Sequence, residues 1–420
     1  MKLLVVGSGG REHAVIRKLK ENKEIKKIYC APGNGGISAD AECVDIKATD
    51  KENMVKFAKE NAIDFCVVTP DDPLALGMVD VMEEAGIPCF GPKANAAIIE
   101  ASKAFSKDLM KKYGIPTADY ETFDNEKDAL HYIEEKNTFP IVIKADGLAL
   151  GKGVLICETL DDAKTALREM MVEHVFGLSG NKVVVEEFMT GKEVSVLAFT
   201  DGNVVKPMIS SMDHKRAYDN DEGLNTGGMG TIAPSPYYTK EIAETCMETI
   251  FLPTVKAMNA EGRTFKGCLY FGLMLTPKGP RVVEYNCRFG DPETQVVLPL
   301  LNSDLLTIMK ACHDGTLKDV DVVWSKEACA CVVEASGGYP VKYEKGFEIH
   351  GLDENGQHDG VIVYHAGTKK ENGKFYTNGG RVLGITAKGA TLQDALDKAY
   401  EAVKEIGFDK MHYRTDIGKK

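Results

Sequence analysis

Short apolar runs alternate with amphipathic segments over the first hundred residues. Strand-like runs occupy residues 3–6, 25–30 and 63–68, and segments with helical spacing occupy residues 11–20, 53–60 and 76–85. Runs of this length are typical of strands buried on both faces, and strands that alternate with helices form a parallel sheet. The pattern therefore predicts an α/β domain that ends near residue 101, after turn signals at Pro88, Gly91 and Pro92.

The pattern changes after this point. Ser102 is a typical N-cap for a helix over residues 103–113, which Gly114 and Pro116 end. Further strands are expected at 141–145, 154–157, 183–188, 193–199, 204–209, 268–275 and 281–286, and further helices at 128–136, 161–171, 240–261, 296–301 and 304–313. Asp201-Gly202 separates two of these strands and is a hairpin signal. We therefore expect a mixed or antiparallel sheet in this part.

The remainder of the chain is rich in strands. The clearest lie at residues 328–334, 361–365 and 381–386, and a helix over 392–406 follows them. No internal repeat or low-complexity linker marks a boundary, so the change of pattern alone divides the chain. We expect three parts, an α/β domain at 1–101, an α+β region at 102–325 and a β-rich domain at 326–420.

Composition narrows the classes of function. Lys and Arg number 51 and Asp and Glu number 63, so the net charge is 51 − 63 = −12. Such acidity argues against a nucleic-acid binder with a general basic surface, but it permits anionic small molecules. We find no signal peptide and no apolar run of about 18–20 residues, so we expect a cytoplasmic protein without a membrane span. The eleven scattered cysteines are typical of reduced core thiols rather than a zinc site.

A glycine loop, residues 7–10, lies where the first strand meets the first helix. A dinucleotide site would need a third glycine where Glu12 stands, and an acid after the second strand, which ends in Cys30-Ala31-Pro32. Arg11 and His13 can add hydrogen-bond donors at the loop. We therefore favour a phosphate-binding loop over a dinucleotide site, while tight strand–helix packing stays open as the alternative.

A second glycine loop follows a strand that ends in a lysine. Lys144 closes the apolar run 141–145, where a charge needs a partner. Gly147, Gly151 and Gly153, with Lys152 between the last two, can close over an anion through backbone amides. The spacing is not a Walker motif, because Gly153 stands where Ser or Thr is required. The alternative is an exposed hairpin with solvated lysines.

Two further strands end in polar groups. Glu186 and Glu187 could contact the ribose hydroxyls or the adenine amino group of a nucleotide, or could form a solvated strand end. Glu284 and Asn286 are two residues apart, so they share one face of their strand. A carboxylate beside an amide oxygen suits magnesium held against nucleotide phosphates, and Arg288 on the same face could stabilise an acyl phosphate.

Residues 211–230 form a polar, glycine-rich segment that is too long for an idle hairpin loop. Asp213, His214, Lys215 and Arg216 offer an acid, a base and two cations. Residues 225–228 resemble a backbone nest for an anion. A flexible loop without function is the alternative.

These motifs together carry a resemblance to a known family. In order they read GSGGREH, APGNGG, IVIKADGLALGKGV, EEFM, DHKR, NTGGMG, EYNCRFGDPETQ, HAGT, TNGGRVL and YRTDIG. The chain resembles the phosphoribosylamine–glycine ligases of purine biosynthesis, which are ATP-grasp enzymes, over essentially its whole length. The resemblance implies a Rossmann-like N-terminal domain, an ATP-grasp region with residues 118–190 as its smaller flap subdomain, and a small β-rich C-terminal domain.

The resemblance also implies an activity and a set of site residues. ATP would drive the ligation of glycine to 5-phosphoribosylamine, with Mg²⁺ or Mn²⁺, in a protein we expect to be a monomer. The implied catalytic residues are Arg288, Lys144 and Asp213, and the metal ligands are Glu284 and Asn286. The implied ATP contacts are Lys103, Lys144, Gly151, Lys152, Gly153, Glu186, Glu187 and Phe188. The implied substrate contacts are Gly9, Gly10, Arg11, Glu12, Asp71, His214, Lys215, Asn225, Thr226, Gly227, Gly228, Arg288 and Asp291.

Two departures from the family pattern stand out. The family segment GPExPL reads TPDDPL here, so Asp71 is one methylene shorter than the usual Glu. Many relatives carry a metal-binding acid on the strand before the metal pair, whereas residues 271–275 read FGLML. The rival functions are another ATP-grasp ligase or carboxylase, an NAD-dependent oxidoreductase, and a nucleotide-binding regulatory protein without turnover.

Overall fold

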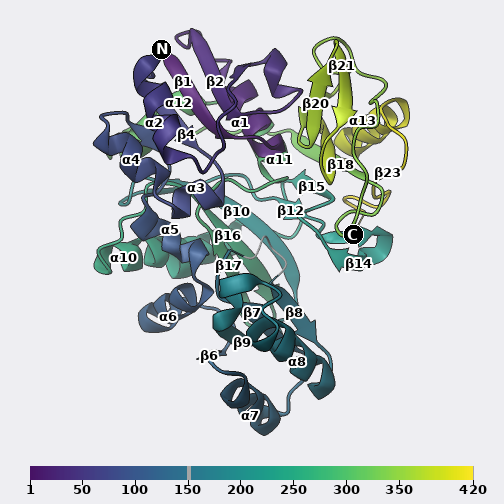
Figure 1. The fold of residues 1–420 in the computed structure, drawn as a ribbon. Coiled ribbons are helices and arrows are strands. Elements are labelled where there is room, and N and C mark those ends of the chain that lie inside the picture. Colours follow the sequence, from purple (N-terminus) through teal and green to yellow (C-terminus); the bar gives the residue numbers. More distant parts are fainter. Residues whose placement is uncertain (149–152, 420) are drawn as a thin grey trace.

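A parallel five-stranded sheet forms the N-terminal part of the computed structural model, which describes residues 1–148 and 153–419 (Figure 1). The strand order is β3-β2-β1-β4-β5. The strands are β1 (Lys2–Gly7), β2 (Lys27–Pro32), β3 (Glu42–Cys43), β4 (Phe65–Val68) and β5 (Cys89–Phe90), and the helices are α1 (Gly10–Leu19), α2 (Lys51–Glu60), α3 (Asp71–Ala75), α4 (Met78–Glu84) and α5 (Ala94–Ala101). The predicted α/β domain is confirmed, since buried apolar residues line both faces of β1 and β4.

Two four-stranded antiparallel sheets form the middle of the molecule. The smaller, β6-β9-β7-β8, contains β6 (Tyr120–Phe123), β7 (Ile141–Ala145), β8 (Val154–Cys157) and β9 (Val183–Glu187). The larger, β11-β10-β16-β17, contains β10 (Lys192–Thr200), β11 (Val205–Pro207), β16 (Gly267–Thr276) and β17 (Gly279–Asn286). Figure 1 shows the smaller sheet projecting away from the N-terminal domain. The mixed or antiparallel sheet predicted for this part is therefore two separate sheets, both antiparallel.

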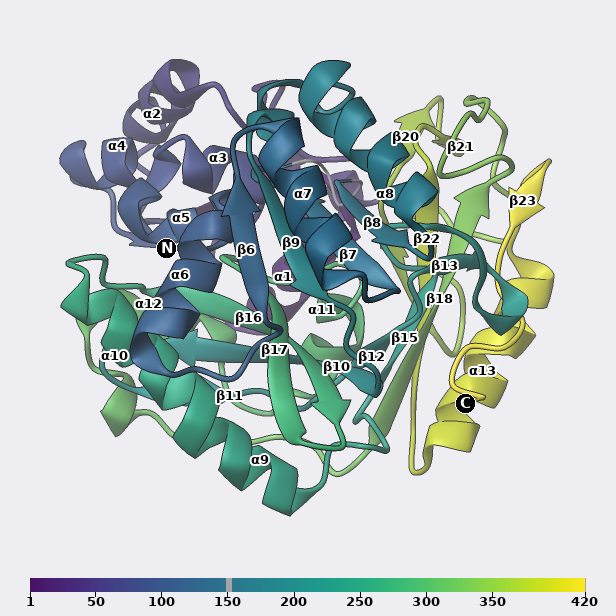
Figure 2. The same ribbon diagram turned by 90° about the horizontal axis from the view of Figure 1, so that it is seen from below.

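Helices cover one face of each middle sheet (Figure 2). The smaller sheet packs against α7 (Glu126–Lys136) and α8 (Leu160–Leu167), and α6 (Lys103–Tyr113) precedes it with the predicted cap, in which Ser102 Oγ accepts the Phe105 amide. The larger sheet packs against α9 (Lys240–Cys246) and α10 (Leu252–Ala260). A π-helical turn at 247–251 joins these two helices without a break, so the long helix predicted at 240–261 is confirmed, with a π-helical turn in its middle.

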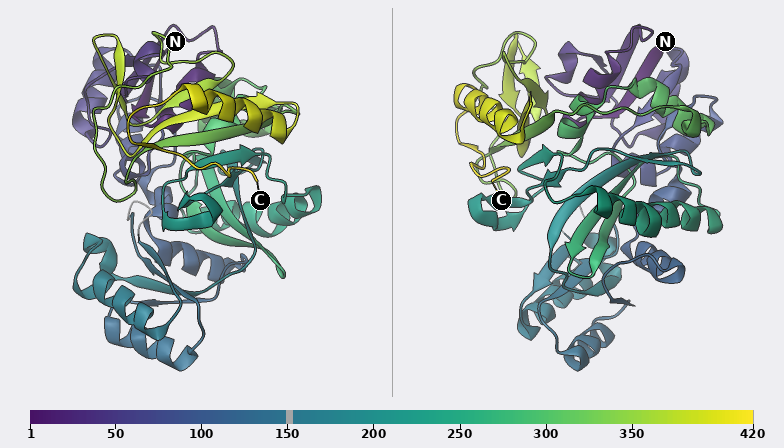
Figure 3. Two further views of the ribbon diagram at one scale, coloured as in Figure 1. Left: turned by 90° about the vertical axis from the view of Figure 1, so that its right-hand side faces the viewer. Right: turned by 180° about the vertical axis from the view of Figure 1, so that it is seen from behind.

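The C-terminal sheet takes strands from two parts of the chain. Its order is β12-β15-β18-β22-β19, and β23 (Met411–His412) also pairs with β18. Its other strands are β12 (Met212–Asp213), β15 (Gly230–Ala233), β18 (Ala328–Ser336), β19 (Ile362–His365) and β22 (Arg381–Gly389). Helix α13 (Leu392–Glu405) packs against this sheet (Figure 3). The segment 211–230 is therefore not one long loop, because β12 and β15 pair within this sheet.

Two hairpins and two helices complete the fold. The hairpins are β13 (Arg216–Tyr218) with β14 (Glu222–Asn225) and β20 (Thr368–Glu371) with β21 (Lys374–Thr377). Helices α11 (Thr294–Val297) and α12 (Leu305–Asp314) contact α1, and their buried residues share a core with β1. The N-terminal domain and the larger middle sheet thus share their hydrophobic core.

No helix within residues 1–148 and 153–419 is both long and apolar enough to cross a membrane. All eleven cysteines are free thiols, and ten of them are buried. Burial raises the pKa of the Cys268 and Cys329 thiols well above the ordinary value, so these groups are protonated core side chains.

Candidate active site

A buried ion pair lies where the two middle sheets meet. Lys144 Nζ on β7 lies 3.0 Å from Glu186 Oε2 on β9, and it also donates a 3.1 Å hydrogen bond to the Val283 carbonyl on β17. Lys144 and Glu186 are only 5% and 4% exposed. The partner that a charge at the end of an apolar strand requires is therefore Glu186 on the neighbouring strand of the same sheet. The hydrogen bond from Lys144 to Val283 joins this sheet to the larger one.

A second lysine from α6 stands behind this pair. Lys107 Nζ donates 2.8 Å hydrogen bonds to Thr117 Oγ1 and the Ala118 carbonyl, and lies 3.8 Å from Glu186 Oε2. Burial lowers the pKa of Lys107 to about 8. Sequence reasoning missed Lys107, although it follows Lys103 by one helical turn and so shares its face.

The first turn of α6 reaches the second glycine loop. Lys103 Nζ donates a 2.8 Å hydrogen bond to the Gly147 carbonyl, and burial lowers the pKa of Lys103. Gly147 has φ +151°, and a Cβ there would lie 2.3 Å from Ser179 Oγ, so only glycine fits. Gly153 is buried, while Gly151 and Lys152 lie outside the described residues.

The end of β9 presents a different set of groups. Glu187 Oε1 pairs with Arg281 Nη1 at 2.7 Å, and Arg281 Nη2 donates to the Thr117 carbonyl at 2.6 Å. Phe188 is 38% exposed. Glu186 Oε1 is buried without a hydrogen-bond partner among the described residues, so it can accept a bond from a donor such as an adenine amino group.

The end of β17 holds the acid, the amide and the guanidinium predicted there. Asn286 Oδ1 accepts a 3.1 Å hydrogen bond from Arg288 Nη2, which also lies 3.1 Å from Glu100 Oε1. Glu100 Oε2 accepts the Cys287 amide at 2.7 Å, and Glu100 is buried. Sequence reasoning missed Glu100, because nothing in residues 94–101 indicates a partner almost two hundred positions away.

Positive charge surrounds Glu284. Burial opposes the charged form, but Lys215, Lys144 and other cations outweigh it, and the pKa of Glu284 is below the ordinary value. Lys215 Nζ lies 3.6 Å from Glu284 Oε1 and 3.8 Å from Glu193 Oε2. Glu284 is therefore an anion at neutral pH, as a ligand to a hard cation must be.

The donor set fits a divalent metal that is shared with phosphates. Within the described part of the chain, no three His, Cys, Asp or Glu side chains converge as a metal site. Glu284 and Asn286 offer two oxygen donors, and magnesium typically takes one or two protein ligands and completes its shell with phosphate and water.

A network of acids lies behind this strand end. Glu293 Oε1 accepts hydrogen bonds from Tyr270 OH at 3.0 Å and Ser195 Oγ at 3.3 Å. Burial and the charge of Glu293 raise the pKa of Asp213 well above its ordinary value. A raised pKa favours the protonated form of Asp213. The ring nitrogens of the neighbouring His214 bond the Gly230 carbonyl and the Gly418 amide.

The segment 225–228 is held by an arginine from the C-terminal domain. Arg381 Nη1 donates to the carbonyls of Gly227 at 2.8 Å and Asp291 at 2.9 Å, and Arg381 Nη2 lies 3.4 Å from Asp291 Oδ1. Gly228 lies against Asp213, since a Cβ there would be 2.6 Å from Asp213 Oδ1. Asn225 ends β14, and Thr226 Oγ1 donates to the Lys215 carbonyl at 2.8 Å. Sequence reasoning missed Arg381.

The first glycine loop, residues 7–10, folds around Glu12. The Gly9 amide donates to Glu12 Oε2 at 2.5 Å, and Glu12 Oε1 pairs with Arg11 Nε at 2.6 Å. A Cβ on Gly7 would lie 2.5 Å from Glu12 Cγ. Glu12 thus fills the space beside the loop, which agrees with the argument against a dinucleotide.

The same loop reaches the end of β17. The Arg11 amide donates to Asp291 Oδ2 at 3.2 Å, and Arg11 Nη1 donates to the Phe289 carbonyl at 3.2 Å. A Cβ on Gly10 would lie 2.6 Å from Gln295 Nε2. Asp71 begins α3, and its charge helps to raise the pKa of Arg288. The contacts therefore bring residues of all three predicted parts into one site.

Comparison with known proteins places these features in a family. Residues 1–100, 101–294 and 329–420 match the models of the N domain, the ATP-grasp (A) domain and the C domain of phosphoribosylglycinamide synthetase. The chain is 49% identical over 417 residues to the phosphoribosylamine–glycine ligase of Caldanaerobacter subterraneus subsp. tengcongensis, with 99% of each chain covered.

Solved structures agree with this match. The crystal structure of phosphoribosylamine–glycine ligase from Thermotoga maritima has a TM-score of 0.88 and 32% identity, with 100% of both chains covered. The biotin carboxylase domain of Hydrogenobacter thermophilus 2-oxoglutarate carboxylase, at 18% identity, has a TM-score of 0.74 over 98% of this chain and 91% of that one. The second likeness is one of fold alone.

The two middle sheets, the buried Lys144–Glu186 pair on the smaller sheet and the acid–amide pair on β17 define an ATP-grasp enzyme. Relatives of several activities share that fold, so the fold alone does not select among them. The chain belongs to the phosphoribosylamine–glycine ligase family, since all three family domains match in order and a full-length relative is nearly half identical.

Proposed function

We propose that the chain uses ATP to join the carboxylate of glycine to the amine of 5-phosphoribosylamine, giving glycinamide ribonucleotide, ADP and phosphate for purine biosynthesis. Family membership over the whole length supports this activity. The observation that carries it is the hydrogen bond from Lys144 to the Val283 carbonyl, because it joins the buried ion pair to the strand that bears Glu284 and Asn286.

The proposed ATP site lies between the two middle sheets. Lys103 and Lys144 neutralise phosphate charge, and the second glycine loop, including Gly153, covers the phosphates. Glu186 accepts a bond from adenine through its unpartnered Oε1, while Glu187 and Phe188 border the ribose and the ring. Exclusion of water by the loop protects a reactive intermediate from hydrolysis.

Glu284 and Asn286 would hold Mg²⁺ or Mn²⁺ against the phosphates. The metal supplies Lewis acidity and charge neutralisation, which phosphoryl transfer between two anions requires. Lys215, 3.6 Å from Glu284, adds positive charge on the glycine side.

The proposed reaction has two steps. A carboxylate oxygen of glycine attacks the γ-phosphorus, the bond to ADP breaks, and glycyl phosphate forms. The amine nitrogen of phosphoribosylamine then attacks the acyl carbon, phosphate leaves, and the amine loses a proton. Arg288 and the segment 225–228 stabilise the charged acyl phosphate, and Asp213, whose pKa is raised, faces the glycine side.

Residues 9–12, with Asp71 and Asp291, form the proposed phosphoribosylamine site. The Gly10 amide and the Arg11 guanidinium lie at the N-terminus of α1, which favours an anion such as a phosphate. In the proposed complex the phosphate would lie on the N-terminal domain and the amine would point toward the end of β17.

Coupled measurement of ADP release tests the proposal. We expect ADP only when ATP, glycine, phosphoribosylamine and Mg²⁺ are all present, and loss of turnover when any one is omitted. ADP release that does not depend on glycine would overturn the assignment. Release that depends on bicarbonate instead would favour a carboxylase.

A further inference from the structure

Asn34, directly after β2, uses its whole side-chain amide to join three segments. Nδ2 donates hydrogen bonds to the carbonyls of Ser8 at 2.9 Å and His365 at 2.8 Å. Oδ1 accepts the amides of Gly36 and Ile37, both at 3.0 Å. One side chain therefore connects the first glycine loop, the turn after β2 and the last residue of β19 in the C-terminal domain.

The bond to Ser8 sets the direction of the next amide in the loop. The Ser8–Gly9 peptide is trans, so its carbonyl and its N–H point in opposite directions. Since the carbonyl is held toward Asn34, the Gly9 N–H is directed to the other side, where it meets Glu12 Oε2 at 2.5 Å. Asn34 thereby helps to hold the Gly9 amide on the Glu12 carboxylate and so fixes the backbone of the loop that leads into α1.

Close contacts around Asn34 hold the turn after β2 against the first glycine loop and against His365. The Gly33 amide donates to the Gly7 carbonyl at 3.0 Å. A Cβ on Gly36 would lie 2.1 Å from the His365 ring, so the backbone approaches His365 as closely as glycine allows. The His365 amide donates to His13 Nδ1 at 2.9 Å, which leaves Nε2 to donate to Asp40 Oδ2 at 2.9 Å.

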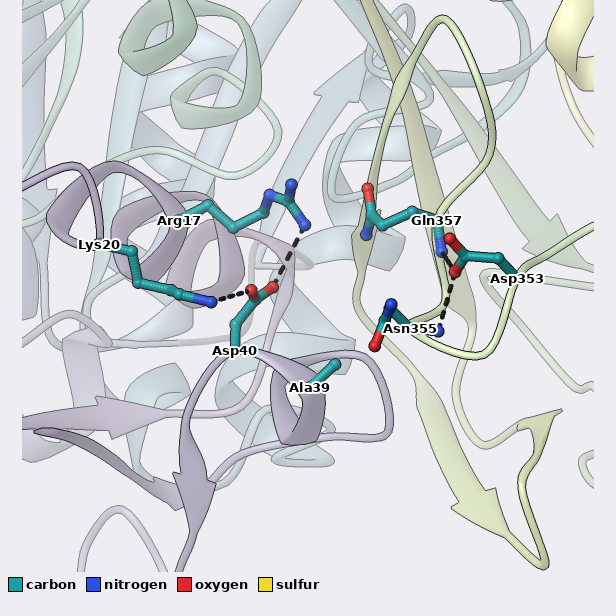
Figure 4. Close-up of a pocket in the computed structure, with 7 residues that line it drawn as sticks. All are labelled: Arg17, Lys20, Ala39, Asp40, Asp353, Asn355 and Gln357. Atoms are coloured by element: carbon teal, nitrogen blue, oxygen red, sulfur yellow. Dashed lines mark hydrogen bonds and ion pairs between the residues drawn. The ribbon is translucent and has the colours of Figure 1, made fainter.

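The contact between the domains opens into a polar cavity on its outer side (Figure 4). The cavity, of about 320 Å³, lies between α1 and the segment 353–357, and Arg17 and Lys20 both pair with Asp40 there. Gln357 contributes to its wall, and its side-chain amide bonds both the N–H and the carbonyl of Val363. Gln357 thus belongs to the same domain contact without touching the first glycine loop.

We propose that Asn34 is a positioning residue for phosphoribosylamine, acting through the Ser8 carbonyl and coupling the substrate loop to the C-terminal domain at His365. The inference rests on the proposed function, in which residues 9–12 bind that substrate. The Asn34 side chain bonds the Ser8 carbonyl, the turn after β2 and the His365 carbonyl, which lie outside the ATP site proposed between the middle sheets. We therefore expect its loss to change the affinity for phosphoribosylamine and to leave the ATP site intact.

Steady-state kinetics of Asn34→Leu test the proposal, because leucine keeps the approximate shape and removes the donors without adding a charge. We expect the KM for phosphoribosylamine to rise about tenfold or more, while the KM for ATP and kcat stay within about twofold. Asn34→Ser, whose hydroxyl can still accept the turn amides, keeps the test valid if the leucine variant does not fold.

Two further variants separate the possible outcomes. Gln357→Met, a matched loss of an amide in the same domain contact, should leave the KM for phosphoribosylamine unchanged. Arg11→Ala should raise that KM if the loop binds the substrate. If Arg11→Ala raises the KM for phosphoribosylamine and folded Asn34 variants do not, the role of Asn34 is overturned and the assignment of the loop stands. No effect from Arg11→Ala overturns the assignment of the loop in the proposed function.

Discussion

The ammonium of Lys144 lies 3.0 Å from the carboxylate of Glu186, and both side chains are almost completely buried. A buried pair of this kind gives little net stability, but removal of one partner leaves the other charge uncompensated. Both residues lie on strands of the smaller sheet, and Lys144 also donates a hydrogen bond to the Val283 carbonyl on the larger sheet of the proposed ATP site. Disruption of the pair should therefore affect both stability and nucleotide binding.

Lys144→Met should lower the free energy of unfolding by about 2–4 kcal/mol, because among the described residues Glu186 then keeps only Lys107, 3.8 Å away, as an ion-pair partner. ATP affinity should fall as well, since the lysine faces the phosphates in the proposed complex. Chemical denaturation and ATP titration measure the two effects. Glu186→Gln combined with Lys144→Met is the control, and it should recover much of the stability and none of the ATP affinity.

Glu284→Ala should abolish ADP formation and leave the fold intact, because the variant loses the carboxylate of the proposed metal pair. The matched control is Glu193→Ala, which removes the other acid near Lys215, 3.8 Å away, and should retain most activity. Turnover and circular dichroism give the two readouts with Mg²⁺ as the only metal. Wild-type turnover in Glu284→Ala would contradict the assignment.

Some of these groups were predictable from local sequence and others were not. A lysine at the end of the apolar run 141–145 required a partner, and the period-2 spacing put Glu284 and Asn286 on one face. Arg381 and Glu100 carry no such local signal, since their contacts with Asp291 and Arg288 are made across the fold. Long-range contacts of this kind arise only from the packing of domains.

Local sequence patterns also predicted only part of the fold. Strong alternation and turn signals predicted the parallel sheet and most helices. The strands β12 and β15 were missed because each has at most four residues and because β15, which pairs with β12, has its other partner, β18, about a hundred residues further on. Alternation of apolar and polar residues must extend over several positions before it indicates a strand, so strands this short cannot be predicted from it.

Glu100→Gln should lower kcat by about tenfold or more with a smaller change in the KM for ATP. Glu100 lies 3.1 Å from Arg288 and accepts the Cys287 amide, so it orients a guanidinium that we place at the acyl phosphate. Steady-state kinetics with ATP and glycine varied in turn measure the split. Glu83→Gln, which loses a partly exposed ion pair with Lys93, should change neither parameter.

Glu334 provides a prediction about stability and pH. It is fully buried on β18, neither carboxylate oxygen has a partner in the described structure, and burial raises its pKa well above the ordinary value. The folded state therefore binds a proton that the unfolded state releases above its pKa of about 4.3. The contribution of this proton to the free energy of unfolding is complete below the unfolded pKa and is lost as the pH rises through the pKa of the folded state.

Glu334→Met should remove this dependence, because methionine has a similar length and no charge. At about pH 8 we expect the variant to be more stable than the parent by about 1–3 kcal/mol, with a smaller difference near pH 5. Denaturation at several pH values measures it. Glu327→Gln, at the residue just before the same strand, is the control, because the pKa of Glu327 is lowered and it stays charged throughout that range. The free energy of unfolding of Glu334→Met should change less with pH than that of the parent, because Glu334 no longer releases a proton on unfolding. Parallel plots of this free energy against pH would contradict the prediction.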